Sequence, residues 1–359
     1  MTAPRHVVVC GAGVIGASVA YFLARRGVAV TVVERSAVAC AASGKSGGFL
    51  ALDWCDDSPL GPLARASFAL HAELARELGT DYGYRRMETF MLAARERGTP
   101  TGGHRVAAPR WLDGAGVVTA ALGSTETTAQ VHPAHFTAAL IAAAQTRGCA
   151  LRIGVVEEVS RRDGTARGVR VNGETLDADA VVLAMGPWTG RFARALRLPR
   201  VRGLKGYSVT LTGADAPAHA LFVEYRTADG HHLEPEIFPR PDGTVYVCGM
   251  ADPQPLPDSP EEVEVSDAAC AALARAAGRV STTLAAARID RRQACYRPVT
   301  DDGLPLIGGV PGVAGAYVAT GHGPWGMLNA PATGLALAEL ITDGAASLLD
   351  LRPFDPGRS

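Results

Sequence analysis

The stretch VVVCGAGVIGASVAYFLARRGVAVTVVER, residues 7–35, decides how the chain folds. It opens with a β-rich apolar run that ends at Gly11 and continues with apolar residues at helical spacing. It closes with a second apolar run that ends at Glu34. Strand, turn, helix and strand in this order predict a βαβ unit, which we place at the edge of a parallel sheet.

Three glycines in the turn have the spacing of a dinucleotide site. Gly11 allows a tight turn, Gly13 lets the backbone approach a pyrophosphate, and Gly16 permits close packing of the helix on the strand. Glu34 is placed for a ribose hydroxyl and disfavours the 2′-phosphate of NADP. The motif does not separate FAD from NAD, and a glycine-rich turn without a ligand is the alternative.

The composition describes an ordinary globular chain with room for two lobes. It has 359 residues, of which 47% are hydrophobic and 20% charged, and a net charge of -1. No basic run favours nucleic acid or an anionic membrane surface, and no apolar run reaches the roughly 18 residues of a membrane span. The chain start is too short for a signal peptide, and seven scattered cysteines favour free thiols. We therefore expect a cytoplasmic protein.

Near its end the chain repeats the order strand, glycine loop and helix. A strand is expected over residues 316–320 and a helix from near Ala332. The dipeptides Asp163-Gly164 and Asn172-Gly173 predict hairpin turns. Further segments with periodic patterns are expected to form helices over 60–78, 131–148 and 267–277 and a strand over 82–92. The expected fold class is α/β, with a Rossmann-like nucleotide lobe from both chain ends and an inserted strand-rich (α+β) lobe.

Five further segments follow the glycine turn in a fixed order. They are ASGKSGGFLA, QVHPAHFTAAL, DADAVVLAMGPWTG, CYRPVTDDGLPLIGG and GHGPWGMLNAPATGLALAELI. Over nearly the whole chain they resemble the D-amino-acid oxidase-like superfamily of FAD-dependent oxidoreductases, in its glycine oxidase and sarcosine oxidase branch. The resemblance implies an FAD-binding domain over 1–80, 128–200 and 296–359, and a substrate domain over 81–127 and 201–295.

The resemblance also implies which residues bind FAD. They are Gly11, Gly13, Val14, Ile15, Glu34, Arg35, Ala42, Ser43, Gly44, Lys45, Gly48, Val156, Ala184, Gly186, Trp188, Cys295, Gly321, Gly323, Trp325, Gly326 and Met327. Backbone N–H groups of residues 321–329 would stabilise the negative charge of the reduced ring. Cys295 has the spacing from Thr300 and Asp302 at which sarcosine oxidases attach the flavin through a thioether. The alternative for Cys295 is an ordinary buried cysteine.

Four residues are candidates for the reaction itself: Arg297, Glu236, His322 and Lys45. By resemblance Arg297 pairs with a substrate carboxylate through two parallel hydrogen bonds, unless it bridges strand ends. Glu236 stands where glycine oxidase-like enzymes place a tyrosine; it would favour an amine, act as a base, or be a solvated acid. His322 either faces the site or holds the flavin loop. No third ligand accompanies the histidine pair 231–232, so no metal site is expected.

One departure from the family pattern concerns dioxygen. Sarcosine oxidases use a lysine on one strand to help dioxygen accept electrons. The corresponding strand here, TVYVCGM, contains no lysine. Lys45 and Lys205 are the two lysines of the chain. Either Lys45 stabilises developing superoxide, or electrons pass to another acceptor. Lys205 and Tyr207 lead from one lobe to the other and could reach the flavin edge.

The resemblance implies oxidation of a C–N bond. Hydride from a small amino acid, secondary amine or amine-bearing metabolite passes to flavin N5, water hydrolyses the imine, and dioxygen is reduced to hydrogen peroxide. Three alternatives remain at this point: an FAD dehydrogenase with another acceptor, a tailoring enzyme for a larger biosynthetic intermediate, and a flavin-holding protein without turnover.

Overall fold

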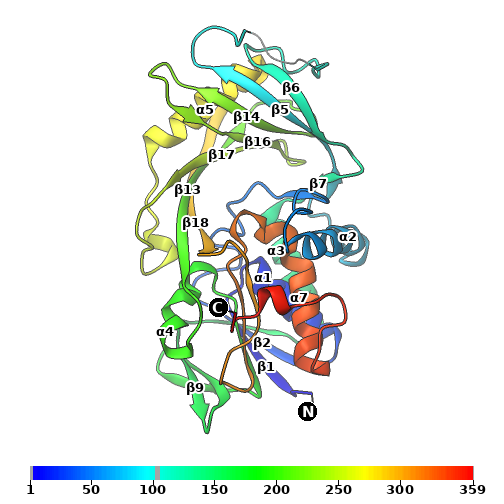
Figure 1. Cartoon of the computed structure of the whole chain (residues 1–359), viewed down its shortest axis with the longest axis vertical. Coiled ribbons are helices and arrows are strands. Elements are labelled where there is room, and N and C mark those ends of the chain that lie inside the picture. The colour runs from blue at the N-terminus through cyan, green and yellow to red at the C-terminus, as the bar shows by residue number, and fades with distance from the viewer. Residues whose placement is uncertain (1–2, 102–105, 359) are drawn as a thin grey trace.

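The structure is a computed structural model that describes residues 3–101 and 106–358. The parts of the expected domains that fall on residues 1–2, 102–105 and 359 lie outside the described residues. Figure 1 shows an elongated molecule with a helix-rich lobe at one end and a strand-rich lobe at the other.

A six-stranded sheet forms the centre of the helix-rich lobe. Its order is β19 (Leu306–Gly309), β20 (Ala316–Thr320), β12 (Ala180–Leu183), β1 (His6–Cys10), β2 (Ala29–Glu34) and β8 (Ala150–Ile153). All neighbours are parallel except β19, which is antiparallel to β20. This confirms the α/β class and the βαβ unit. The predicted position of this unit at the edge of the sheet was wrong, because β12 and β20 extend the sheet beyond β1, and β8 extends it beyond β2.

Both faces of this sheet are covered, which explains why its strands are continuous apolar runs. Val7 and Val9 pack in the core that contains the helices, whereas Val8 and Cys10 pack with Val169 on the opposite face. The helices on the first face are α1 (Val14–Arg25), α2 (Gly61–Glu77), α3 (Pro133–Gln145) and α7 (Gly326–Asp343). Helix α1 lies against both α3 and α7, and α2 lies against α7.

A three-stranded sheet covers the opposite face. It consists of β9 (Val156–Arg162), β10 (Thr165–Val171) and β11 (Glu174–Asp177). Both predicted hairpin turns are confirmed here, with positive φ at Asp163 and Asn172. The short elements beside it are η1 (Gly186–Phe192) and α4 (Ala193–Leu196).

Helix α7 begins at Gly326, six residues before the predicted start near Ala332. The prediction was wrong because Pro331 lies inside the helix. Proline lacks the N–H that would bond to the carbonyl of Met327. Nε2 of His71, from α2, lies 3.0 Å from that carbonyl oxygen and takes the place of the missing donor.

The strand-rich lobe is built on an eight-stranded sheet. Its order is β18 (Arg288–Thr300), β13 (Val201–Thr212), β17 (Val245–Asp252), β16 (Glu236–Pro239), β14 (His219–Arg226), β5 (Glu88–Arg95) and β6 (Val117–Gly123), with β15 (His232–Leu233) beside β14. Helix α5 (Asp267–Val280) packs on one face of the sheet, next to α6 (Thr282–Ala286). Strands β13 and β18 pair over their full length and run from this lobe into the other (Figure 1).

A small sheet joins the lobes. It contains β3 (Phe49–Ala51), β7 (Thr128–Gln130) and β4 (Arg85–Arg86). The single strand expected over 82–92 is therefore two strands in two sheets, β4 and β5. The remaining 3-10 turns are η2 (Pro260–Glu262), η3 (Gly323–Trp325) and η4 (Arg352–Phe354).

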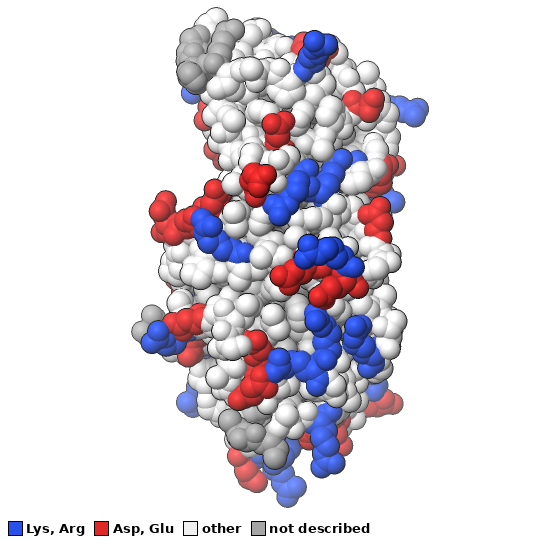
Figure 2. Space-filling view, turned by 90° about the vertical axis from the view of Figure 1, so that its right-hand side faces the viewer, with Lys and Arg blue, Asp and Glu red and all other residues white. Residues whose placement is uncertain are grey.

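The surface has no large region of one charge on the face that Figure 2 shows, where basic and acidic side chains are interspersed. Across the described residues, no helix has the length and apolar composition needed to cross a bilayer.

Candidate active site

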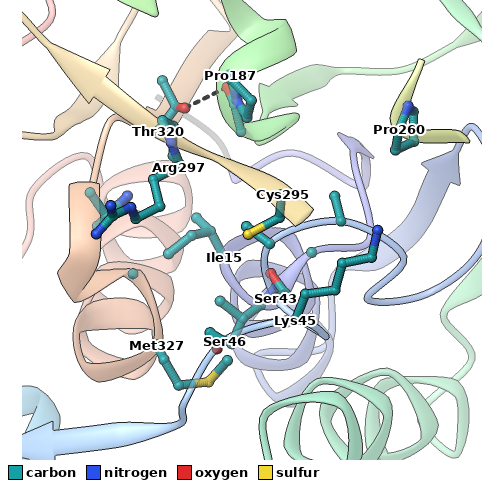
Figure 3. Close-up of a pocket in the computed structure, with 18 of the residues that line it drawn as sticks. Ile15, Ser43, Lys45, Ser46, Pro187, Pro260, Cys295, Arg297, Thr320 and Met327 are labelled. Carbon is teal, nitrogen blue, oxygen red and sulfur yellow. Dashed lines mark hydrogen bonds between the residues drawn. The ribbon is translucent and has the colours of Figure 1, made fainter. Parts of the chain in front are cut away.

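A cavity of about 490 Å³ is lined by residues of both lobes (Figure 3). This volume is within the usual range for sites that bind small molecules. One side is formed by the β1–α1 turn, the loop after β2 and the turn before α7. The other side is formed by one face of the eight-stranded sheet.

Most of the residues expected to bind the cofactor line this cavity. They are Gly11, Gly13, Val14, Ile15, Glu34, Arg35, Ala42, Ser43, Lys45, Gly48, Val156, Ala184, Gly186, Trp188, Cys295, Gly323, Trp325, Gly326 and Met327. Gly44 and Gly321 are not in its wall. Gly44 packs against the backbone of Ala39, and Gly321 packs against Thr300.

The β1–α1 turn presents a helix N-terminus to the cavity. Gly11 has φ +105°, and a Cβ there would lie 2.6 Å from the carbonyl oxygen of Ala184, so only glycine fits. The first turn of α1 contains no acidic residue, and Val14 and Ile15 line the cavity. The positive end of the helix dipole is therefore available to an anion such as a pyrophosphate.

Glu34 is held by the backbone beside this helix N-terminus. One carboxylate oxygen accepts from the N–H of Ala12 at 2.8 Å, and the other accepts from the N–H of Ser36 at 3.0 Å. The side chain is buried and lines the cavity. A carboxylate has further lone pairs after these two bonds, so it can also accept from a ribose hydroxyl.

A second helix N-terminus, that of α7, reaches the same cavity. Gly323 and Gly326 line it, and the first turn of α7 has no acidic residue. His322 lies in the wall and also holds the loop, because its Nε2 lies 3.0 Å from the hydroxyl of Thr333. Burial lowers the pKa of His322 to about 3, so the imidazole is neutral at physiological pH.

The sheet that closes the other side brings together side chains from strands far apart in sequence. Glu236 on β16 lies opposite Phe222 of β14 and opposite Cys248 of β17. Cys295 and Arg297 are two residues apart on β18, so they share a strand face. All five line the cavity, and Figure 3 shows Cys295 and Arg297 among the side chains around it.

Arg297 and Glu236 carry opposite charges without an ionic partner. Among the contacts of the described residues, the Arg297 guanidinium makes no hydrogen bond or ion pair, and Glu236 makes no ion pair. Glu236 accepts from the Cys248 thiol, with 3.4 Å between Oε2 and Sγ. Burial raises the pKa of Glu236, while the Cys248 hydrogen bond and the charge of Arg297 act in the opposite direction.

The two lysines occupy different environments. Lys45 lines the cavity, and its ammonium donates to the carbonyl of Ala294 at 3.3 Å. Lys205 is buried, 5.3 Å from the Tyr207 ring centre, and is not part of the cavity wall. Tyr207 does line the cavity, and its hydroxyl donates to Asp252 at 2.6 Å. Burial raises the pKa of the Cys295 thiol, and the charges of Arg297 and Lys45 oppose that shift.

Comparison with known proteins agrees with this geometry. The family model of FAD-dependent oxidoreductases called DAO matches residues 6–340. The chain belongs to the DAO family of FAD-dependent oxidoreductases. This confirms the resemblance seen in the sequence motifs.

Two known proteins are similar in sequence to this chain over nearly its whole length. A Schizosaccharomyces pombe chain, named as a candidate oxidoreductase, is 31% identical over 392 residues, covering 99% of both chains. Glycine oxidase of Geobacillus kaustophilus is 29% identical over 379 residues, covering 99% of this chain and 97% of that one. The crystal structure of the latter superposes with a TM-score of 0.84 over 100% of both chains, at 27% identity.

The loop that follows β2 in this DAO-family chain is fixed by its neighbours. Four consecutive carbonyls, those of residues 45–48, each accept a hydrogen bond. The donors are the Tyr246 hydroxyl at 2.7 Å, the Arg240 guanidinium at 2.7 Å, the Gln130 amide at 3.3 Å and the Val131 N–H at 3.0 Å. Tyr246 and Arg240 come from the eight-stranded sheet and the turn after β16, so the strand-rich lobe holds a loop of the cofactor side.

Sequence reasoning missed an aromatic wall beside Glu236. We use this name for Phe49, Trp54, Phe222, Phe238 and Trp325, all of which line the cavity. Successive ring centres lie 5.0 to 6.3 Å apart. The one available signal was Phe238, which follows Glu236 at strand spacing and so shares its face.

In the ranges 3–101 and 106–358, no group of three or more histidine, cysteine, aspartate or glutamate side chains is placed to hold a metal ion.

Proposed function

We propose that this chain oxidises the C–N bond of an amino acid or related amine. The observation that carries the proposal is the guanidinium of Arg297, which has no hydrogen-bond or ionic partner among residues 3–101 and 106–358, in a residue that lines the same cavity as the helix N-terminus of α1. A guanidinium without a protein partner is suited to a carboxylate of the substrate, because it can form two parallel charge-assisted hydrogen bonds.

The residues around the cavity suit FAD. We propose that the N-terminus of α1 binds its pyrophosphate, Glu34 its ribose, and the N-terminus of α7 the pyrimidine end of its ring. Bound there, FAD would take a hydride from the carbon beside nitrogen, leaving an imine that water hydrolyses, and would pass two electrons to an acceptor. Cys295 is the residue we propose for any covalent link to the cofactor.

The protein's own part is to orient the substrate and to keep bulk water away from it. Arg297 would hold a carboxylate and thereby fix the position of the adjacent Cα–H. The aromatic wall would limit access of water. His322, being neutral and bonded to Thr333, would keep the α7 turn in place without adding charge.

Dioxygen is the acceptor that we propose, with hydrogen peroxide as its product. The support is Lys45, a lining residue of the cavity whose positive charge would stabilise developing superoxide. A second candidate, a dehydrogenase with another acceptor, is favoured by β17, whose cavity-lining positions are occupied by Tyr246, Cys248 and Gly249 and not by lysine. All seven cysteines are unpaired, which supports our proposal of a cytoplasmic location.

Anaerobic mixing with a panel of amino acids and amines tests the proposal. We expect at least one compound to bleach the visible flavin absorbance, and admitted air to restore it with formation of peroxide. Bleaching without fast reoxidation would select the dehydrogenase. Failure of every compound to bleach bound FAD would contradict the proposed function. Acid precipitation tests Cys295: colour in the pellet supports a covalent link, and a colourless pellet excludes it.

A further inference from the structure

The cavity contains two features besides Arg297 and the glycine turns that would bear on the substrate. One is Glu236, a carboxylate without a cationic partner among the described residues. The other is the aromatic wall beside it. Phe49, Trp54 and Trp325 are only half-buried although they lie in the interior between the lobes.

Glu236 and Arg297 together define the charge of the ligand. They lie on strands of the same sheet, line one cavity and sense each other's charge, yet no ion pair joins them. Both side chains are partly buried, and a partly buried carboxylate or guanidinium without a counter-charge is stabilised when a ligand supplies one. The matching ligand carries an amine toward Glu236 and a carboxylate toward Arg297.

The aromatic wall defines the rest of the ligand. Phe222 lies directly opposite Glu236, and Phe238 follows it on the same strand face. Phe49 lies 5.3 Å from Phe222, and Trp54 lies 5.0 Å from Phe222, measured between ring centres. The aromatic surface that remains exposed toward the cavity favours an apolar group of the ligand.

We infer that the substrate is a zwitterionic amino acid with a large apolar side chain, held by Glu236 and Arg297 and packed on the aromatic wall. This inference rests on the proposed function, since it names the substrate class for the same site. In this inference Glu236 and Trp54 determine the substrate specificity.

The test compares matched ligands on the FAD-loaded protein. The set is glycine, both enantiomers of leucine and phenylalanine, 2-phenylethylamine, which lacks the carboxylate, and 3-phenylpropanoate, which lacks the amine. Binding is measured by the change in flavin absorbance, and anaerobic reduction is measured in parallel. We expect one enantiomer of leucine or phenylalanine to bind at least about tenfold more tightly than glycine and than either phenyl analogue.

Two variants separate the contribution of the carboxylate from that of the aromatic wall. Glu236→Gln keeps the shape of the side chain and should remove the preference for phenylalanine over 3-phenylpropanoate. Trp54→Leu should weaken the binding of phenylalanine about tenfold and leave the binding of glycine nearly unchanged. Trp111→Leu is the matched control, because Trp111 donates to His219 and does not line the cavity.

The outcomes distinguish this inference from the proposed function. If glycine or 2-phenylethylamine binds and reduces the flavin best, the inference is overturned while C–N oxidation stands. If no ligand reduces the flavin but leucine or phenylalanine still binds most tightly and depends on Glu236, the inference stands and the proposed function fails.

Discussion

The two sides of the cavity are built by different means. On the cofactor side, the glycine turns before α1 and α7 present backbone and two helix N-termini to the cavity. The opposite side consists of side chains on one face of the eight-stranded sheet. Backbone donors do not depend on residue type beyond the glycines, whereas the side chains of the sheet can be exchanged one at a time. The same frame can therefore keep FAD while its substrate changes.

The largest expected effect comes from disturbing the backbone-built side. A Cβ at Gly16 would lie 1.9 Å from the carbonyl oxygen of Gly11, so Gly16→Ala must push α1 away from the turn. We expect FAD affinity, measured by flavin fluorescence titration, to fall about 100-fold or more, with circular dichroism reporting folding. Gly309→Ala is the control, since its Cβ meets open space. Normal FAD affinity in Gly16→Ala would contradict the proposal that the β1–α1 turn binds FAD.

On the side built from side chains, Arg297→Met should leave FAD binding intact. We expect kcat/KM for an amino-acid substrate to fall about 100-fold, because a charged pair between guanidinium and carboxylate is lost. Arg292→Met on the same strand serves as control, since Arg292 is 47% exposed and pairs with Asp267. Loss of FAD from Arg297→Met, in place of loss of turnover, would show that the two sides are not separable.

The histidine that supports α7 predicts a pH dependence of stability. Burial lowers the pKa of His71 to about 4, below its unfolded value of 6.5. The unfolded chain therefore binds the proton first, and stability is lost as the pH falls below 6.5. Between pH 7 and 5 we expect His71 to remove about 2 kcal/mol from the free energy of unfolding.

Urea unfolding at both pH values measures this effect. His71→Gln keeps a donor for the Met327 carbonyl but does not titrate, so its stability should fall less with acid. The exposed His231 supplies the control variant His231→Gln. Equal pH dependence in wild type and His71→Gln would contradict the prediction.

The smallest effect concerns the two lysines. Lys45→Met should slow reoxidation by dioxygen about tenfold and leave anaerobic reduction unchanged, because its charge acts on the acceptor step. Lys205→Met should change neither rate, since Lys205 does not line the cavity. Stopped-flow absorbance separates the two steps. Fast reoxidation in Lys45→Met would remove the support that Lys45 gives to dioxygen as acceptor.

The sequence allowed the βαβ unit beside the cavity to be predicted, for a physical reason. Gly11 and Glu34 act within one βαβ unit, so their spacing along the chain determines their spacing in space. The hairpin turns at Asp163 and Asn172 are equally local. Helix α7 was placed too late because its proline is supported by His71, a residue more than 250 positions away.

The opposite side could be predicted only through family resemblance. Glu236, Cys248 and Arg297 meet because β16, β17 and β18 share a sheet, and strand order is not contained in any local pattern. The aromatic wall escaped prediction for the same reason, since Phe49 and Phe222 become neighbours only after the lobes pack together.

The hydrogen bonds to the carbonyls of residues 45–48 have a mechanical consequence. By sequence this loop follows the nucleotide-binding unit, but two of its carbonyls are bonded to Tyr246 and Arg240 of the strand-rich lobe, and the other two to residues at the end of β7. A hinge motion between the lobes would have to break these bonds or carry the loop along. Because the carbonyl of Lys45 is bonded to Tyr246 of the sheet, a rotation of one lobe against the other would change where the charge of Lys45 lies relative to the cofactor.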